Sequence, residues 1–277
     1  PLALFQFISM KKVVLITGAS SGLGKATANY LADQGYLVYG TSRNPDNYET
    51  PNKYQLIPLN LNKINTIQKG VDIVLKNEGR IDILINNAGT GIIGPIEELE
   101  MSAIHSNFET NLYGPLKLVQ AILPQMRKQQ NGFIINITSI ACSIGLPYRG
   151  GYSASKGALS LLTEAIRMEV SPFGIKVCTV APGDFVSDIA SRRYYAPLKN
   201  ESPYKKIYKK NLNTINKHID SGINPQIIVK KILHILNSNN PKVHYSVGSP
   251  LQKFSVILKS ILPSKLFEKL LMLFYTN

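Results

Sequence analysis

A glycine-rich turn near the start of the chain constrains the fold more than any other stretch. The apolar run 12–17 leads into Gly18, Gly22 and Gly24, and a helical pattern then continues to about Asp33. A strand, a glycine turn and a helix in this order open a dinucleotide-binding fold, in which the free N–H groups of the helix face the pyrophosphate. The first glycine permits the tight turn, the second lets the backbone approach the ligand, and the third lets helix and strand pack closely. The candidate cofactor residues of this turn are Gly18, Ser20, Ser21, Gly22, Leu23 and Gly24.

The end of the second predicted strand bears on the choice of cofactor. Residues 36–41 form this strand, and Ser42 and Arg43 follow it. Folds selective for NAD usually place an acid here, which accepts a hydrogen bond from the ribose 2′-hydroxyl. This chain instead has Arg43, which can form a fork onto a 2′-phosphate while Ser42 donates a hydrogen bond. We therefore expect NADP(H) to be preferred over NAD(H).

Strands and helices alternate along most of the remaining chain. Apolar runs such as 81–86 are typical of strands that helices cover on both faces. The pattern predicts further strands over 55–59, 81–86, 132–139, 175–180 and 243–247, and helices over 64–76, 99–112, 114–129, from Tyr152 to about Val170, and over 227–236. This alternation predicts a Rossmann-type α/β fold, a doubly wound parallel sheet of about seven strands with helices on both faces. The absence of an internal repeat or linker favours a single domain spanning 1–277.

Two residues one helical turn apart, Tyr152 and Lys156, are the candidates for acid–base chemistry. A phenol has an ordinary pKa of ~10, and a nearby ammonium favours the phenolate and lowers that pKa. The pair can therefore act as an acid or base in a carbonyl/alcohol interconversion, provided that something else supplies the hydride. Alone, a Tyr and a Lys at this spacing more often form a solvated helix face.

The last third of the chain is strongly basic. Of 31 Lys and Arg residues, 15 lie in 189–277, where Glu201, Asp220 and Glu268 are the acids. This imbalance indicates an anionic partner: a lipid headgroup, an acidic substrate or a nucleic acid, and the last ranks lowest because no nucleic-acid-binding module is present. The polar, tyrosine-rich stretch 187–221 is interpreted as a substrate lid containing some helix.

Residues 251–275 alternate apolar side chains with lysines, and Pro263 divides them into two short amphipathic helices. Such a C-terminal helical lid can lie in a membrane interface, cover the substrate cleft or pack against a second subunit, and the sequence leaves the three open. No apolar run is long enough to span a membrane. Two cysteines at 142 and 178 fit a reducing compartment and form no metal-binding spacing. We therefore expect a cytoplasmic protein without metal, with peripheral contact to the inner face of a membrane left open. Met10 is the expected natural start, with 1–9 as upstream sequence.

Several short motifs occur together in an order that resembles the short-chain dehydrogenase/reductase family. They are Thr17-Gly18 with Gly22 and Gly24, Asn86-Asn87-Ala88-Gly89, Asn111, Ser139, Tyr152 with Lys156, and Pro182-Gly183. The resemblance covers about 10–248, and stretches 89–98 and 171–177 are similar to the branch of 17β-hydroxysteroid and retinol dehydrogenases.

The resemblance implies a role for each of these residues. Tyr152 is the expected proton donor, Ser139 orients the substrate carbonyl, and Lys156 lowers the tyrosine's pKa while holding the nicotinamide ribose. Asn111 is expected to hold a water that relays protons to Lys156. The cofactor residues implied by the resemblance are Asn60, Leu61, Asn87, Ala88, Gly89, Tyr152, Lys156, Pro182, Gly183 and Ser187.

The sequence departs from the family pattern at two places. Asn60-Leu61 stands where Asp-Val is common beside the adenine, and Ser187 stands where a Thr usually holds the nicotinamide carboxamide. An amide oxygen can still accept from the adenine amino group, and the serine keeps the hydroxyl, so we expect little loss.

The leading hypothesis is an NADP(H)-dependent oxidoreductase that interconverts a ketone or aldehyde and an alcohol on a steroid-, retinoid- or lipid-like substrate. The resemblance also implies a homodimer or homotetramer, joined through the helices that bear Asn111 and Tyr152. One alternative is a non-catalytic, dinucleotide-binding regulatory protein, since fold does not imply function. A nucleotide-sugar epimerase or dehydratase is a weaker alternative, because the tail leaves little room for the larger C-terminal domain of those proteins.

Overall fold

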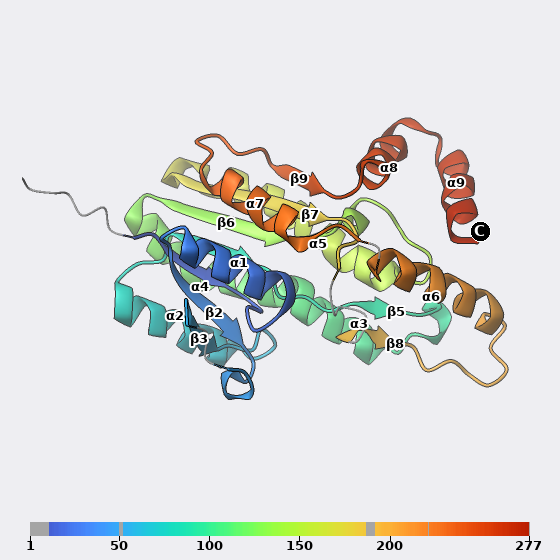
Figure 1. Cartoon of the computed structure of the whole chain (residues 1–277), viewed down its shortest axis with the longest axis horizontal. Helices are drawn as coiled ribbons and strands as arrows, with labels where there is room; N and C mark the ends of the chain where they lie inside the picture. The colour runs from blue at the N-terminus through green and yellow to red at the C-terminus, as the bar shows by residue number, and fades with distance from the viewer. Residues whose placement is uncertain (1–10, 50–51, 187–191, 221, 277) are drawn as a thin grey trace, which may run out of the picture.

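A seven-stranded parallel sheet forms the centre of the molecule (Figure 1). This computed structural model describes residues 11–49, 52–186, 192–220 and 222–276, with the backbone alone for 218–220 and 274–276. The strand order is β3-β2-β1-β4-β6-β7-β9, so the chain reverses direction across the sheet between β1 and β4. The strands are β1 (Val13–Ile16), β2 (Leu37–Ser42), β3 (Gln55–Pro58), β4 (Ile83–Asn86), β6 (Gly132–Ile137), β7 (Ile175–Pro182) and β9 (His244–Val247). The predicted fold class is confirmed.

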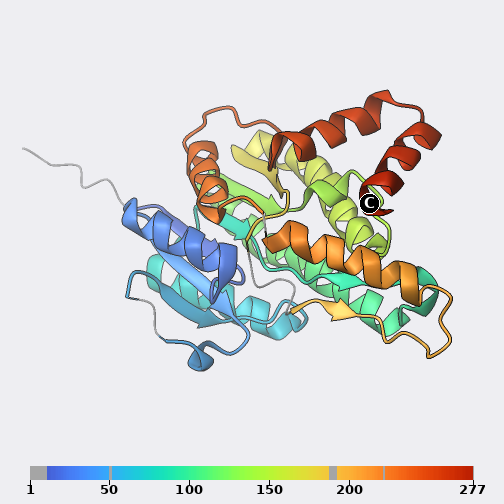
Figure 2. The same cartoon turned by 45° about the vertical axis from the view of Figure 1, so that its right-hand side comes forward.

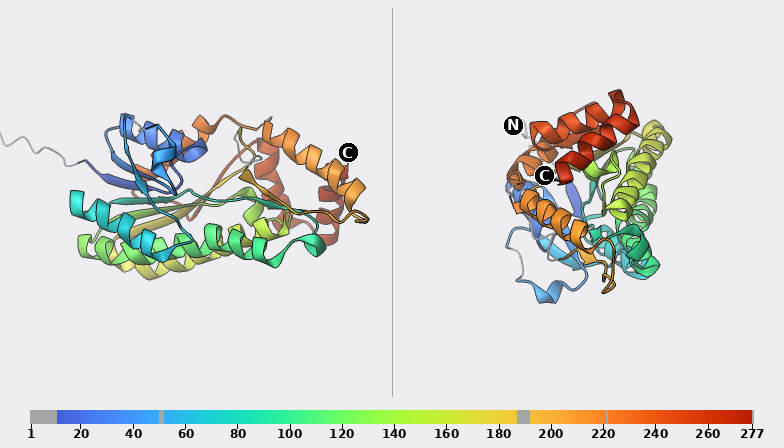
Figure 3. Two further views of the ribbon diagram at one scale, coloured as in Figure 1. Left: turned by 90° about the horizontal axis from the view of Figure 1, so that it is seen from below. Right: turned by 90° about the vertical axis from the view of Figure 1, so that its right-hand side faces the viewer.

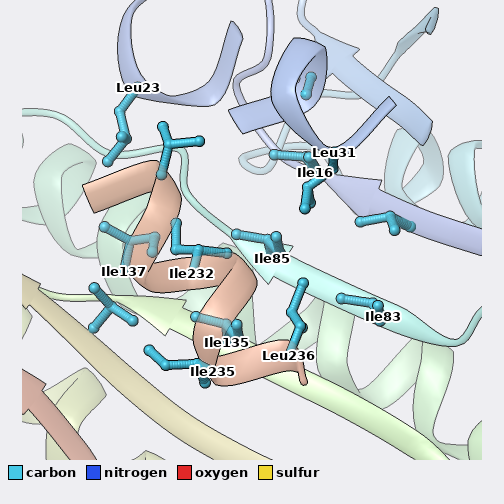
Figure 4. Packing of buried hydrophobic residues seen from close by; sticks show 14 of the residues in the cluster. Ile16, Leu23, Leu31, Ile83, Ile85, Ile135, Ile137, Ile232, Ile235 and Leu236 are labelled. Atoms are coloured by element: carbon cyan, nitrogen blue, oxygen red, sulfur yellow. The ribbon is translucent and has the colours of Figure 1, made fainter. Parts of the chain in front are cut away.

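Helices cover both faces of this sheet, as Figure 3 shows from below. One face carries α1 (Gly22–Asp33) and α7 (Pro225–Leu236), and the other carries α2 (Ile64–Glu78), α4 (Gly114–Gln129) and α5 (Gly150–Val170). On the first face, Ile232 and Leu236 of α7 pack onto Ile85 and Ile135 (Figure 4). Apolar strands contacted on both faces exclude water along their whole length, which is why they read as continuous apolar runs.

The helix expected over 99–112 is interrupted. It consists of α3 (Met101–Phe108) followed by a π-helical turn, Glu109–Tyr113, that leads directly into α4. Sequence periodicity gave no sign of this turn, which carries the buried Asn111. Short π-helical turns often mark functional sites.

A second, two-stranded sheet lies beyond the carboxyl ends of the main strands, and the sequence did not predict it. It pairs β5 (Ile92–Ile93) with β8 (Tyr194–Tyr195). Elsewhere in the described residues there are short 3₁₀ turns at Pro45–Asn47, Ile96–Glu98, Ile140–Cys142 and Ser171–Phe173. Because β5 and β8 are two residues long, no periodic pattern could have revealed them.

The C-terminal third contributes three helices outside the sheet layers: α6 (Lys205–Asp220), α8 (Pro250–Ile261) and α9 (Ser264–Thr276). Pro263 separates α8 from α9, as predicted, and α9 lies beside α6 (Figure 2). Helix α8 begins with a capping box in which Ser249 Oγ accepts from the Gln252 N–H and Gln252 Oε1 accepts from the Ser249 N–H. None of the helices in the described ranges is long and apolar enough to cross a membrane. The expected upstream segment 1–9 with Met10, and Ser187, lie outside the described residues.

Candidate active site

The glycine turn is tied to the neighbouring strand end by one threonine hydroxyl. Thr17 Oγ1 accepts from the backbone N–H groups of Asn87 and Ala88, both at 3.0 Å. In return, Asn87 Nδ2 donates to the carbonyl oxygens of Thr17 and Gly18, at 2.9 and 3.3 Å. These bonds fix the two strand ends that flank the reversal point of the sheet, where ligands of such folds bind.

Backbone geometry explains two features of the glycine turn. Gly18 and Gly22 adopt the left-handed conformation, with φ of 67° and 54°. A Cβ on Gly24 would lie 2.2 Å from the Gly18 carbonyl oxygen and 2.5 Å from Asn87 Nδ2, so only glycine allows this close packing. No side chain caps α1, which leaves the N–H groups of its first turn available to an anion.

A cavity of about 500 Å³ runs from the glycine turn along the ends of β2, β3 and β4. Buried Ser42 and exposed Arg43 lie at its far end, at the tip of β2. Its walls include thirteen of the predicted cofactor residues: Gly18, Ser20, Ser21, Gly22, Leu23, Gly24, Ser42, Arg43, Asn60, Leu61, Asn87, Ala88 and Gly89. A cavity that starts at an uncapped helix N-terminus and passes three strand ends fits a dinucleotide.

Arg192 also lines this cavity, and the sequence analysis missed it. Its Nη1 donates to Ser21 Oγ across 171 positions of sequence. A guanidinium beside the uncapped start of α1 adds positive charge where a pyrophosphate would sit. The general basicity of the C-terminal third was the available signal, and it could not say which arginine folds back over the glycine turn.

Tyr152 and Lys156 project from α5 into a smaller pocket that continues from the cofactor cavity. Ser139, Asn87, Gly89, Pro182 and Gly183 line the same pocket, so the structure brings these predicted residues together. Lys156 is 4% exposed, and its Nζ donates to the Ile137 carbonyl oxygen at 2.8 Å. Burial lowers the pKa of Lys156 to about 8.

Lys156 is not among the groups that lower the pKa of Tyr152 in this structure, and its expected effect on the tyrosine stays a prediction. Burial raises the pKa of the Tyr152 phenol, and the groups that oppose this rise are the Arg149 guanidinium, the Ser139 hydroxyl and Arg193. Desolvation penalises the phenolate, and the Lys156 ammonium is engaged by a backbone carbonyl. In this state Tyr152 is a protonated donor at neutral pH.

Asn111 is fully buried, and its side-chain amide forms hydrogen bonds that join two neighbouring segments. Its Oδ1 accepts from the Thr90 N–H at 2.8 Å, while its Nδ2 donates to the Thr90 carbonyl at 2.9 Å and to Ser155 Oγ at 3.1 Å. A Cβ on Gly89 would lie 3.2 Å from both Asn111 Oδ1 and Lys156 Nζ, so both groups lie close to Gly89. The relay water expected at Asn111 stays a prediction.

Three charged residues in the catalytic pocket were missed by the sequence analysis: Arg149, Asp184 and Arg193. The Arg149 guanidinium lies 5.4 Å from the centre of the Tyr152 ring. Arg193 is 8% exposed and lies over the Tyr195 ring, and Asp184 Oδ2 accepts from Gln252 Nε2 at 2.9 Å. No ion pair joins these three residues to each other or to another described residue. Because all three residues line the pocket, they add charge to its walls.

An apolar cavity of about 420 Å³ adjoins this pocket. The two share Ser139, Arg149, Gly183 and Asp184, so the cavity opens directly beside the tyrosine. Its walls come from the segment after β6, from α6 and from α8 and α9, and include Ile140, Ile144, Leu146, Ile215, Leu258, Phe267 and Leu271. The described residues contain no cluster of three His, Cys, Asp or Glu side chains that could hold a metal ion.

One known protein family matches most of this chain. The family model for short chain dehydrogenases matches residues 12–196. The chain is a short-chain dehydrogenase/reductase. Members of this family are oxidoreductases that act on alcohol and carbonyl groups with a nicotinamide dinucleotide, and the resemblance seen in the sequence is confirmed, including its retinol- and steroid-dehydrogenase-like branch.

Three individual proteins are similar to this short-chain dehydrogenase/reductase over most of its length. It is 38% identical to a 3-ketodihydrosphingosine reductase of Bacteroides thetaiotaomicron, over 95% of this chain and 98% of that protein. It superposes with a TM-score of 0.82 on a short-chain dehydrogenase from Streptomyces avermitilis, at 30% identity over 91% of this chain and 94% of that one. A gluconate 5-dehydrogenase from Burkholderia cenocepacia, solved with NADP and tartrate, gives a TM-score of 0.62 at 28% identity, over 64% and 73% of the two chains.

Proposed function

We propose that this protein is an NADPH-dependent reductase of long-chain ketones, of the 3-ketodihydrosphingosine type. The observation that carries the proposal is the apolar cavity that opens beside Tyr152 and Ser139. A chain of methylene groups placed there leaves water, while the ketone stays at the acid–base residues. The proposal is further supported by the similarity to a reductase of that name over nearly the whole of both chains.

The proton chemistry is assigned to Tyr152, with Ser139 and Lys156 in support. The Ser139 hydroxyl and the Tyr152 phenol interact, so both can donate to one carbonyl oxygen in the shared pocket. Because burial raises the pKa of Tyr152, the phenol keeps its proton at neutral pH until an alkoxide develops beside it. Lys156 lies beside Gly89 at the end of the cofactor cavity, where its ammonium would hold the ribose, and Asn111 fixes this arrangement through Thr90 and Ser155.

The cofactor cavity fits NADPH, which when bound supplies the hydride. The start of α1, with Ser20, Ser21 and Arg192, would hold the pyrophosphate, and Ser42 and Arg43 would hold the 2′-phosphate. Asn60 and Leu61 would lie beside the adenine; Asn60 Oδ1 already accepts from the Asn62 N–H and has a second lone pair available. Pro182 and Gly183 would lie at the nicotinamide, and Ser187, outside the described residues, is kept as a proposed partner of its carboxamide.

Asp184 is proposed to recognise an amino group next to the ketone. Its carboxylate lines both the catalytic pocket and the apolar cavity, so it lies where the headgroup and the alkyl chain of a 2-amino-3-ketone would meet. Gln252 Nε2 is its one hydrogen-bond donor among the described residues. An ammonium would add a charge-assisted hydrogen bond there.

A homodimer or homotetramer through α5 and the helical segment around Asn111, where α3 leads through the π-helical turn into α4, is also proposed, as is a cytoplasmic location. Leu161 and Met168 of α5 are 68% and 71% exposed, and Tyr113 at the start of α4 is 45% exposed. Large apolar side chains exposed on one helix pair favour a subunit interface.

Replacing Tyr152 with Phe removes the transferable proton and should lower kcat for ketone reduction by at least ~10²-fold. The Kd of NADPH should change little, because the ring and its packing remain. Steady-state kinetics and a fluorescence titration measure the two quantities. Tyr148→Phe, which alters a phenol in a neighbouring apolar cluster, is the control and should keep its turnover. Near-normal turnover of Tyr152→Phe would remove Tyr152 from the mechanism.

Replacing Arg43 with Asp should weaken NADPH and improve NADH, because a carboxylate repels a 2′-phosphate and accepts from a 2′-hydroxyl. The wild type should bind NADPH at least ~10-fold more tightly than NADH. Isothermal titration with both cofactors measures this preference. Asn44→Asp, which adds a carboxylate one residue later and keeps the arginine, should retain the preference for NADPH. Equal affinity of the wild type for both cofactors would refute the assignment.

Among 3-ketones of increasing length, kcat/KM should rise by up to about fourfold per methylene until the apolar cavity is filled. Leu258→Trp should flatten this rise, because Leu258 lines the cavity, while kcat/KM for the shortest ketone stays the same. Ser260→Trp, on the exposed side of the same helix, is the control. NADPH consumption across the series gives both slopes, and a flat wild-type series would exclude a long-chain substrate.

Asp184→Asn should reduce kcat/KM for a 2-amino-3-ketone by at least ~10-fold relative to the 3-ketone of equal length that lacks the amine. The ratio of the two substrates is the readout, since a general disturbance of the pocket lowers both values together. Glu164→Gln, an exposed carboxylate paired with His244, controls for the loss of one charge. An equal loss of kcat/KM on both ketones would show that Asp184 does not recognise the amine.

A further inference from the structure

Helices α8 and α9 form a pair that is anchored on its inner side. The Lys259 ammonium of α8 lies 5.4 Å from the centre of the Phe267 ring of α9. Phe267 is 5% exposed and belongs to an apolar cluster with Ile140 and Ile144, in the segment that follows β6. Helix α9 also packs against α6. The α8–α9 pair therefore packs against the segment after β6 and against α6, at the end of the molecule seen in Figure 2.

The outer side of the same pair is apolar. We call six of its residues the apolar stripe: Phe254, Ile257 and Ile261 on α8, and Leu266, Leu270 and Leu273 on α9. Their exposed fractions run from 44% for Leu270 to 71% for Ile261. Within each helix the spacing is three and four residues, which places the three side chains on one face. Large exposed apolar side chains gathered on one face of each helix mark an interaction site.

Lysines border the apolar stripe. Lys253, Lys259, Lys265 and Lys269 are exposed on α8 and α9, and Glu268 is the one acid among residues 250–273. Neighbouring α6 adds the exposed Lys205, Lys206 and Lys209. Two identical faces of this composition would bring like charges together, whereas anionic lipid headgroups would neutralise them. Apolar side chains flanked by lysines suit the boundary between headgroups and acyl chains.

The apolar cavity opens on this side of the molecule. Leu251 and Leu270 both line the cavity and are 60% and 44% exposed, so they stand at its mouth, one on each helix of the pair. A hydrophobic chain entering there would pass between α8 and α9 and reach Ser139 at the inner end. The mouth of the cavity and the apolar stripe therefore lie on the same side of the molecule.

We propose that α8 and α9 dock onto an anionic lipid bilayer, with the mouth of the apolar cavity turned toward the acyl chains, so that a lipid ketone enters directly from the membrane. This inference rests on the proposed function for the identity of the substrate. The docking itself depends on the apolar stripe and its lysines alone.

The docking is tested by sedimentation with two kinds of vesicle, phosphatidylcholine alone and phosphatidylcholine mixed with phosphatidylglycerol. The full chain should bind the mixed vesicles, and high salt should weaken this binding. Phe254→Asp combined with Ile257→Asp should weaken it by at least ~10-fold, as should Lys253→Glu combined with Lys265→Glu. The matched control is Ile64→Asp combined with Met101→Asp, which places two carboxylates at equally exposed apolar positions elsewhere and should bind like the wild type.

Entry from the membrane is tested by kinetics on two substrates. The Phe254/Ile257 variant should keep its kcat/KM for a short, water-soluble ketone and lose at least ~10-fold on a long-chain ketone embedded in mixed vesicles. An equal rate on the embedded ketone would overturn the entry route. Absence of salt-sensitive vesicle binding by the full chain would overturn the docking, and so would a dimer that this variant dissociates, since the stripe would then be a subunit interface. Failure of every ketone with NADPH would refute the proposed function while the vesicle measurement still decides the docking.

Discussion

The site depends on the way Thr17 and Asn87 bind two strand ends together. One hydroxyl accepts two N–H groups from the β4 end, and one amide returns two bonds to the β1 end. Parallel strands on either side of the reversal point would otherwise end in separate loops. Because these ends are fixed, the glycine turn keeps its left-handed residues and α1 starts close enough to pack Gly24 onto Gly18. The cofactor cavity is the space that this arrangement leaves open.

A second set of contacts extends this order to the acid–base residues. The π-helical turn at 109–113 carries Asn111 into the interior, where its amide joins the loop after β4, through Thr90, to α5, through Ser155. Lys156 comes from the same helix and is held by the end of β6. Burial has opposite effects on the two titratable partners, because it raises the pKa of Tyr152 and lowers that of Lys156. Both shifts favour the neutral forms, because burial penalises the phenolate and the ammonium alike.

The parts of the fold that the sequence predicted depend on local patterns. Apolar runs, glycine spacing and the Tyr152–Lys156 pair belong to single segments, and the structure brings the predicted residues into two adjoining cavities. The missed residues are placed by contacts between distant segments. Arg192 reaches Ser21, β8 reaches β5, and Asp184 meets Gln252 across 68 positions. No periodic pattern within a single segment indicates such long-range contacts. The sequence could not indicate that burial raises the pKa of Tyr152, because spacing shows which charges are near and cannot show how far water is excluded.

The Gln252 side chain contacts three different parts of the molecule. It closes the capping box of α8, its Nε2 holds Asp184, and its Oε1 leaves no room for a Cβ at Gly183 or Gly248. The start of the outermost helix pair and the end of the central sheet are therefore one unit. In a chimera made with a relative, the C-terminal helices could not be exchanged alone, because residues 183, 184, 248 and 252 would have to move with them.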